Sequence, residues 1–485
     1  MTNTLRYCLP LLFLLTLSTR ARAQDAGPVL GEWYAILDAM GTKLPVGLQL
    51  AIGENGQLGG TMTSPSQTKA KIPLNDVSWN GSNFRFAVNA LGARYDAALN
   101  AGELRGVFNQ AQVDFPLVFT RHRPQGFPIG DGPITVRARA QDPTDFPYER
   151  RGVTFPGAAD GVALSGELTL PSKGKPKAVA ILLAGSGPSD RNHYLGADIN
   201  HSPFLVLSDY LTRRGYAVLR YDDRGVGEST GDFRSATSAD MAEDAFAAVR
   251  FLREEKDLRK VPVGLIGLSE GGLIAPVVAA ADGELDFVVL MAAPGVSGDS
   301  LMLQQYKKIN ETMGMPAPLI DRNLRSYRAA YTWIREHPEL DSTAYEEGLY
   351  GVFEEQLVNL PAPLRRSIRD PRAFNQQFVG PLMSPWMRYF IGFDPQEYLS
   401  RLTAPTLIMN GLLDTQVPAM ENMNAISQAL ARAENDDIEL VPLPGLNHLF
   451  QPATTGAPTE YGQIETTMDP GALETIGAWL DARFE

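Results

Sequence analysis

The feature that most constrains this chain is a short apolar run that leads directly into a serine between glycines. Residues Val263–Ile266 are followed by Gly267-Leu-Ser269-Glu-Gly271, and then by an apolar stretch over residues 273–281. This order predicts a strand, a sharp turn and a helix, the context of a nucleophilic serine. Glycines two residues to either side leave the space that such a turn needs. The helix beneath Ser269 would favour negative charge developing at the reacting centre.

A serine hydroxyl needs a base to take its proton, and the chain contains only five histidines. His122 and His337 lie in polar surroundings and are expected to be solvated. His193 and His201 precede the serine, at a position expected for contacts to the oxyanion or the substrate. His448 follows the last predicted strand, which is the place for the base when the order is serine, acid, histidine.

The acid that orients the base should follow the strand between the serine and His448. Asp414 lies in the loop after the predicted strand Thr406–Met409 and is the candidate. Two alternatives remain open. Asp414 could only cap the helix that follows, and Asp299, after the preceding strand, is the reserve acid.

Two backbone N–H groups should stabilise the oxyanion of the tetrahedral intermediate. The residue after the nucleophile, Glu270, supplies one of them. The second is expected from Ser186, because Gly185 and Gly187 let the loop after an earlier strand approach the substrate closely.

The segment Tyr221–Ser229 carries several charges beside glycines. We interpret Asp222 and Arg224 as a structural ion pair next to the pocket. The sequence contains no dinucleotide-binding signature, no phosphate-binding loop and no histidine-rich ligand set, so we expect neither a cofactor nor a metal.

From Arg151 onward, apolar runs alternate with helical stretches, which predicts a parallel sheet with crossover helices. The expected strands are Ala178–Leu183, Ala217–Tyr221, Val263–Ile266, Phe287–Met291, Thr406–Met409 and Ile438–Pro442. More than a hundred residues separate the fourth strand from the fifth. We expect residues 298–396 to form a helical cap, with one helix over residues 321–337.

The N-terminal part of the chain has a different pattern of apolar residues. Apolar residues alternate with a period of two from Gly31 to Arg121, and turn signals such as Asn80-Gly81 separate the runs. This pattern predicts a small antiparallel β-domain, shaped like a barrel, over residues 27–122. Residues 123–150 are rich in Pro, Gly and Asp and are expected to be a linker.

The first 23 residues have the order of a secretory signal: a basic start, an apolar run, and small residues before the expected cleavage after Ala23. The apolar run is too short to span a bilayer, so no stable membrane anchor is expected. The single cysteine, Cys8, lies within this segment, which excludes cysteine chemistry from the mature chain. Removing the segment takes the net charge from −13 to −16, which argues against a nucleic-acid partner.

Taken together, these motifs resemble those of secreted bacterial serine hydrolases of the α/β-hydrolase superfamily, in the carboxylesterase or lipase-like branch. The segments that carry the resemblance are Gly185–Arg191, Tyr221–Gly225, Gly267–Gly271 and Leu446–Phe450. The resemblance covers residues 151–485 and implies an acyl-enzyme that water hydrolyses, without a cofactor. Glu270 departs from the His or Gln often found after the nucleophile.

The sequence therefore predicts an α/β-hydrolase domain with a helical cap, preceded by an antiparallel β-domain. The expected function is that of an exported carboxylesterase acting on a small-molecule ester through Ser269, His448 and Asp414. A peptidase or amidase of the same fold is one alternative. A non-catalytic binding protein is the other, although an ordered set of serine, acid and base makes it the weaker of the two.

Overall fold

The computed structural model describes residues 26–484, apart from residues 40–41, 54–57, 65–67, 89–92, 111–112, 124–138, 361 and 369. The chain divides into two compact units, Met1–Gly130 and Asp131–Glu485. The expected signal segment, residues 1–23, lies outside the described residues, and so does most of the expected linker. The last two residues of that linker, Glu149 and Arg150, already belong to a strand.

Antiparallel strands make up the first unit, after the short 3₁₀ helix η1 (Gly27–Val29). They form a four-stranded sheet in the order β1-β2-β3-β4 and a five-stranded sheet in the order β5-β6-β7-β8-β9. A backbone bridge between Tyr34 and Thr120 joins the first strand to the end of the last. The strands are β1 (Gly31–Ala39), β2 (Thr42–Ile52), β3 (Leu58–Ser64), β4 (Thr68–Pro73), β5 (Asn75–Trp79), β6 (Asn83–Val88), β7 (Ala93–Asn100), β8 (Glu103–Gln110) and β9 (Val113–Phe119).

The period-two pattern explains how this unit holds together. Alternate residues of β7 are buried and exposed, because successive side chains of a strand point to opposite faces. The buried face contributes to a core of its own that includes Trp33, Phe84, Tyr95 and Phe119. The Tyr95 hydroxyl donates to the carbonyl of Leu104 at 2.7 Å, so this buried polar group is satisfied.

An eight-stranded sheet in the order β10-β11-β13-β12-β14-β15-β16-β17 forms the centre of the second unit. The first three strands pair antiparallel, and from β13 to β17 all pairings are parallel. The strands are β10 (Glu149–Pro156), β11 (Ala163–Leu170), β12 (Val179–Leu183), β13 (Ala217–Tyr221), β14 (Val263–Leu268), β15 (Phe287–Met291), β16 (Thr406–Gly411) and β17 (Ile438–Leu443). The six predicted strands are confirmed as β12 to β17 to within two residues at each end, while β10 and β11 were not predicted.

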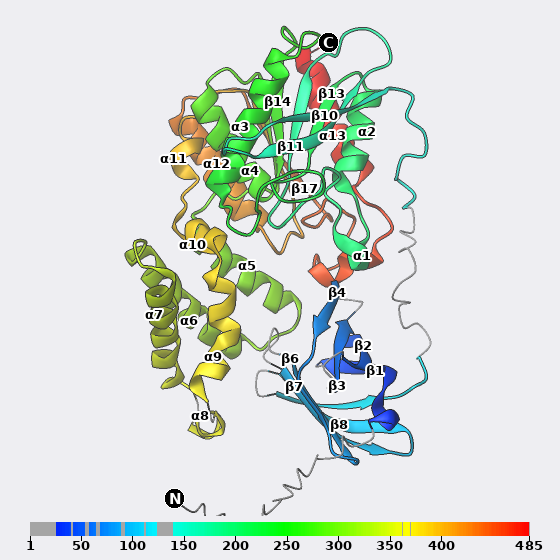
Figure 1. Cartoon of the computed structure of the whole chain (residues 1–485). Coiled ribbons are helices and arrows are strands. Elements are labelled where there is room, and N and C mark those ends of the chain that lie inside the picture. The colour runs from blue at the N-terminus through cyan, green and yellow to red at the C-terminus, as the bar shows by residue number, and fades with distance from the viewer. Residues whose placement is uncertain are drawn as a thin grey trace, which may run out of the picture. The chain divides into compact units, whose positions relative to one another are not determined.

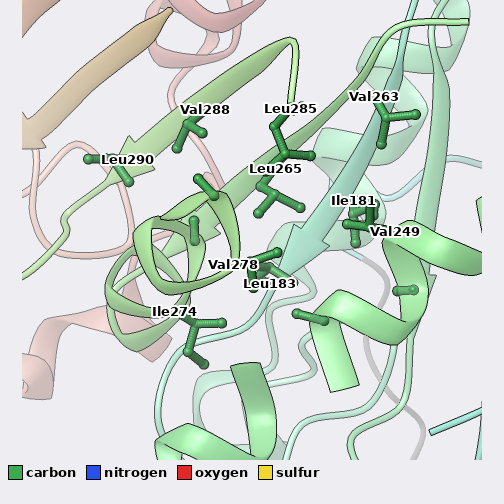
Figure 2. Packing of buried hydrophobic residues seen from close by; sticks show 14 of the residues in the cluster. Ile181, Leu183, Val249, Val263, Leu265, Ile274, Val278, Leu285, Val288 and Leu290 are labelled. Atoms are coloured by element: carbon green, nitrogen blue, oxygen red, sulfur yellow. The ribbon is translucent and has the colours of Figure 1, made fainter. Parts of the chain in front are cut away.

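Helices cover both faces of this sheet, because its central strands are apolar on both sides. One face packs against α2 (Pro203–Arg213) and α13 (Pro470–Phe484), and the other against α3 (Ser238–Glu254), α4 (Glu270–Asp282) and α12 (Ala419–Arg432) (Figure 1). Figure 2 shows Ile274 and Val278 of α4 packed against Leu183 and Leu265 of the sheet. This architecture confirms the predicted α/β-hydrolase fold.

The segment between β15 and β16 is helical. It contains α5 (Gly298–Thr312), α6 (Ala317–Glu336), α7 (Ser342–Leu357), α8 (Ala362–Ser367), α9 (Pro371–Val379), η3 (Gly380–Met383), α10 (Pro385–Gly392) and α11 (Gln396–Leu399). Residues 298–396 are called the cap below. Most of it packs around its own apolar cluster, which includes Tyr331, Tyr345 and Leu349. A second cluster joins Leu301 and Phe390 of the cap to Leu273 and Val417 of the sheet domain.

Two short helical segments complete the second unit, α1 (Gly196–Ile199) and η4 (Pro458–Gln463). Among the residues that the structure describes, no helix is both long enough and apolar enough to cross a membrane.

Candidate active site

Ser269 stands between the end of β14 and the start of α4, in a backbone conformation with φ 55° and ψ −118°. A positive φ is unfavourable for a residue with a side chain, and such strain is typical of functional positions. Only glycine fits at the positions two residues before and two residues after Ser269. A Cβ on Gly267 would lie 2.1 Å from the carbonyl oxygen of Gly271, and a Cβ on Gly271 would lie 2.1 Å from that of Leu183.

His448 and Asp414 form a buried pair. They lie in the loops after β17 and β16, with side chains about 6% and 0% exposed, and His448 Nδ1 is 2.8 Å from Asp414 Oδ2. The other carboxylate oxygen, Oδ1, accepts the N–H groups of Gln416 at 2.7 Å and Val417 at 2.8 Å. The carboxylate is thus held by its own loop while it fixes the orientation of the imidazole.

The contacts of Asp414 and Asp299 bear on the two alternatives for the acid. Helix α12 begins at Ala419 with Pro418 before it, so the bonds of Asp414 fix a loop and do not cap that helix. Asp299 lies in the first turn of α5 instead. Its carboxylate accepts from Ser297 and pairs with Arg335 of the cap at 2.9 Å.

Ser269 and His448 line the same cavity, which has a volume of about 260 Å³. Gly185, Ser186 and Glu270 line it too, so the structure brings the predicted nucleophile, base and oxyanion residues together. Asp414 lies behind His448 and outside the lining. Hydrogen bonds between nucleophile and base are often loose before a substrate binds, and here the two side chains share the cavity without a direct bond.

The two predicted oxyanion donors are Ser186 and Glu270. Glu270 is the first residue of α4, so its N–H has no acceptor within the helix. In the described ranges, the Ser186 N–H donates to no backbone carbonyl. Its loop is held further along, where the Ser189 N–H donates to Asp223 Oδ2 at 2.9 Å and the Asp223 N–H donates to Ser189 O at 3.0 Å.

The side chain of Glu270 has a role that sequence reasoning missed. Its Oε1 accepts the Ser238 hydroxyl at 2.5 Å and the Trp386 Nε1–H at 2.7 Å, so the residue after the nucleophile is bonded to cap helix α10. No sequence signal links Glu270 to Trp386, which follows it by 116 residues.

The Glu270 carboxylate also affects Asp223. Burial raises the pKa of Asp223 to about 7, and the nearby Glu270 carboxylate adds to that rise.

Of the other histidines, His193 lines the cavity, as expected of a residue in contact with substrate. Its Nδ1 lies 2.7 Å from the Ser189 hydroxyl. Burial, together with the neighbouring His448, lowers the pKa of His193 to about 4, so its ring is neutral at pH 7. His201 does not line the cavity and is bonded to Thr467 and to the carbonyl of Ile464.

The predicted ion pair between Asp222 and Arg224 is wrong. Asp222 pairs with Arg191 at 2.6 Å, and Arg224 pairs with Asp244 of α3 at 2.7 Å. The side chains of the two neighbouring residues have different partners, so Asp222 fixes the loop of Arg191, and Arg224 attaches its turn to a helix. Both remain structural contacts, as expected.

Within the described ranges, no three His, Cys, Asp or Glu side chains are grouped so that they would hold a metal ion. Among the described residues that line the cavity, Glu270 is the only acidic one, and none is a lysine or an arginine.

Comparisons with known proteins find similarity to hydrolases. Residues 201–345 match the family model described as serine aminopeptidase, S33. Esterase EstD of Thermotoga maritima is 24% identical over 343 residues, which are 70% of this chain and 68% of that protein. The uncharacterized protein PA2218 of Pseudomonas aeruginosa is 26% identical over 181 residues, which are 36% of this chain and 46% of that protein.

Two solved structures show looser likeness. The esterase Pf2001 of Pyrococcus furiosus aligns with 70% of this chain and 92% of its own, at 18% identity and a TM-score of 0.41. A proline iminopeptidase of Mycobacterium smegmatis aligns with 68% and 98%, at 16% identity and a TM-score of 0.42.

The sheet, the strained serine and these similarities together define the chain as a serine hydrolase with the α/β-hydrolase fold. Within that class, the matched segment runs from the loop before α2 into the cap and includes Ser269.

Proposed function

We propose that this protein is an exported carboxylesterase that cleaves small-molecule esters through an acyl-enzyme on Ser269. The observation that carries the proposal is the buried pair of His448 and Asp414, 2.8 Å apart, whose imidazole faces the same cavity as the strained serine. The similarity to the esterase EstD supports the choice of esters.

In the proposed reaction, Ser269 Oγ attacks the ester carbonyl while the imidazole of His448 takes its proton. The backbone N–H groups of Ser186 and Glu270 donate to the oxyanion, and Asp414 stabilises the imidazolium. The imidazolium then gives its proton to the departing alcohol. A water molecule, deprotonated by the same imidazole, attacks the acyl-enzyme, and collapse of the second intermediate releases the acid and restores the Ser269 hydroxyl.

The same triad can cleave amides, and the match to a model described as serine aminopeptidase makes a peptidase the second candidate. An aminopeptidase must bind the ammonium group of its substrate, which requires an anionic partner. The only acidic side chain in the described lining of the cavity is Glu270, and its Oε1 already accepts two hydrogen bonds. This arrangement favours a neutral ester.

A fluorophosphonate probe tests the nucleophile, because it reacts covalently with an activated serine. We expect the wild-type protein to be labelled and Ser269→Ala to remain unlabelled. Equal labelling of the variant would assign the nucleophile to another residue, and an unlabelled wild type would contradict the proposed catalysis.

Rates on p-nitrophenyl esters and on aminoacyl arylamides, measured at equal concentration, distinguish the two candidates. We expect the esters to be cleaved faster, and faster amide cleavage would make the protein a peptidase. Export is tested separately, by fractionating cells that express the full chain or the chain without residues 2–23. Only the full chain is expected outside the cytoplasm.

A further inference from the structure

A row of three polar side chains lines the same cavity beside the catalytic pair. Gln305 comes from cap helix α5, Gln416 from the loop after β16, and Tyr461 from η4. Gln305 Nε2 donates to Gln416 Oε1 at 3.3 Å, and Gln416 Nε2 donates to the Tyr461 hydroxyl oxygen at 3.0 Å. Three elements that are distant in sequence thus bring one hydrogen-bonded row to the cavity, which we call the polar row.

The polar row is connected to the catalytic pair through Asp414. Gln416 is two residues from Asp414, and its backbone N–H donates to the carboxylate of Asp414. Burial raises the pKa of Tyr461 far above its usual value, and the nearby Asp414 carboxylate raises it further. Tyr461 therefore stays protonated at neutral pH, and it keeps a proton to donate.

The polar row has hydrogen-bonding capacity left over. A phenol offers one donor, and each amide offers two donors and one carbonyl acceptor. With the bonds as described, the Tyr461 hydroxyl only accepts, and among the described residues its proton has no acceptor although the residue is 3% exposed. If the amides of Gln416 and Gln305 are both turned over, the Tyr461 hydroxyl donates to Gln416, and the unused donor is an N–H of the Gln305 amide. Either way, the row ends in an unused donor.

A buried donor without a partner is costly, so such a site favours a substrate oxygen that completes it. The proposed reaction indicates which part of the substrate carries this oxygen. The imidazole of His448 returns its proton to the leaving alcohol, so that alcohol must lie beside His448. The polar row is bonded to Asp414, the partner of His448, which makes it the polar part of the lining best connected to that alcohol. The lining also includes the apolar side chains Leu301, Trp386 and Phe390, which suit the acyl group.

We propose that the polar row formed by Gln305, Gln416 and Tyr461 is the subsite for the leaving alcohol, and that it selects esters of polyols or sugars over esters of hydrocarbon alcohols. This inference rests on the proposed esterase function and narrows its substrate class. The hydroxyl next to the ester oxygen accepts the free proton of the polar row, and the amides supply the other contacts.

Two butyrate esters of equal size test the inference. 2-Hydroxyethyl butyrate and n-propyl butyrate differ only by a hydroxyl in place of a methyl group, and both release butyric acid, which is titrated at constant pH. The ratio of their kcat/KM values, divided by the same ratio for alkaline hydrolysis, isolates the contribution of the protein. We expect a preference of about tenfold for the hydroxyethyl ester in the wild type, the effect of one neutral hydrogen bond.

Tyr461→Phe removes only the hydroxyl and should reduce this preference to about one. The control is Tyr350→Phe, since Tyr350 also bonds a glutamine, Gln376, but lies in the cap outside the cavity. That control should keep the full preference. If Tyr461→Phe slows both esters by the same factor, its role is structural and the inference is wrong.

Fluorophosphonate labelling separates the two levels of the proposal. A wild type that is labelled but shows no preference between the esters would overturn the alcohol subsite and leave the proposed esterase intact. A wild type that is neither labelled nor active on either ester would overturn both.

Discussion

Asp223 is expected to make the stability of the protein depend on pH. Its carboxyl group accepts a hydrogen bond from Ser189, in the loop that carries the proposed oxyanion donor Ser186. The pKa of Asp223 rises from 3.8 to about 7 in the folded chain, mainly because the carboxyl is withdrawn from water. Between about pH 4 and pH 7 the folded state therefore holds a proton that the unfolded state has lost. The free energy of unfolding should fall as pH increases through that window and as the folded carboxyl ionises.

Asp223→Asn tests this directly, because asparagine remains neutral and keeps an oxygen that can accept from the Ser189 N–H. Urea unfolding at pH 5 and at pH 8 measures the effect. We expect the wild type to lose more stability between these pH values than the variant does. An identical loss in both proteins would show that Asp223 does not titrate in this range.

Asp414 and Asp299 provide a matched pair for testing the acid. Asp414→Asn should lower kcat by about 10⁴, because an amide no longer holds the productive tautomer of His448. Asp299→Asn removes a carboxylate bonded to Arg335 and should leave kcat within about twofold, a typical margin for a distant substitution. Steady-state rates on a p-nitrophenyl ester decide. A larger loss in Asp299→Asn would exchange the roles of the two residues.

At the scale of residues, the sequence allows a prediction where the signal lies in neighbouring positions of the chain. Ser269 was recognisable because glycines, an apolar strand and a helix surround it within a few positions. The ion pair of Asp222 and Arg224 was predicted wrongly, because closeness in sequence does not decide pairing: Asp222 pairs with Arg191, and Arg224 pairs with Asp244. The bond from Trp386 to Glu270 had no local signal at all.

At the scale of elements, the turn between β14 and α4 leaves no space for a larger residue. Gly271→Ala would place a methyl group 2.1 Å from the carbonyl oxygen of Leu183, so the turn or β12 must move. We expect a loss of several kcal/mol, at or above roughly 3 kcal/mol, with a lower melting temperature and little activity.

Gly152→Ala is the control for this substitution. Gly152 lies in β10, has no atom within 4 Å of an added Cβ and has no positive φ. The melting temperature should stay near that of the wild type, because alanine is no worse than glycine in a strand. Equal losses in the two variants would mean that crowding at the turn is not the cause.

Burial accounts for most of the predicted strands but not for all of them: β17 was predicted although none of its residues is buried, and β11 was missed although most of its residues are buried. Strands β12 to β16 are buried along almost their whole length and appear in the sequence as apolar runs. Strand β10 starts with Glu149, Arg150 and Arg151 and lies at the edge of the sheet. Because many of its side chains are exposed and polar, its sequence does not contain an apolar run that would predict a strand. The cap was expected to be helical, but its contacts with the turn between β14 and α4 depend on tertiary packing.

At the scale of the whole molecule, each unit has a core of its own. The cluster of the first unit contains only residues between Val29 and Phe119, and every residue that lines the candidate active site is Gly185 or later. Deleting residues 24–122 should therefore leave kcat/KM on small esters within about twofold and the second unit folded. Circular dichroism and ester hydrolysis measure this, and loss of activity in a folded truncated protein would assign the first unit a part in the site.

The three proposed catalytic side chains follow β14, β16 and β17, and the whole cap lies between the first two of these strands in sequence. A chain emerging from the ribosome thus carries its serine long before it has the proposed base, because His448 follows Ser269 by 179 residues. Until His448 has been made, the serine has no group to take its proton. Strand β17 comes last of the eight in sequence and lies at one edge of the sheet, so we expect the proposed base to reach the serine only after β17 has paired with β16.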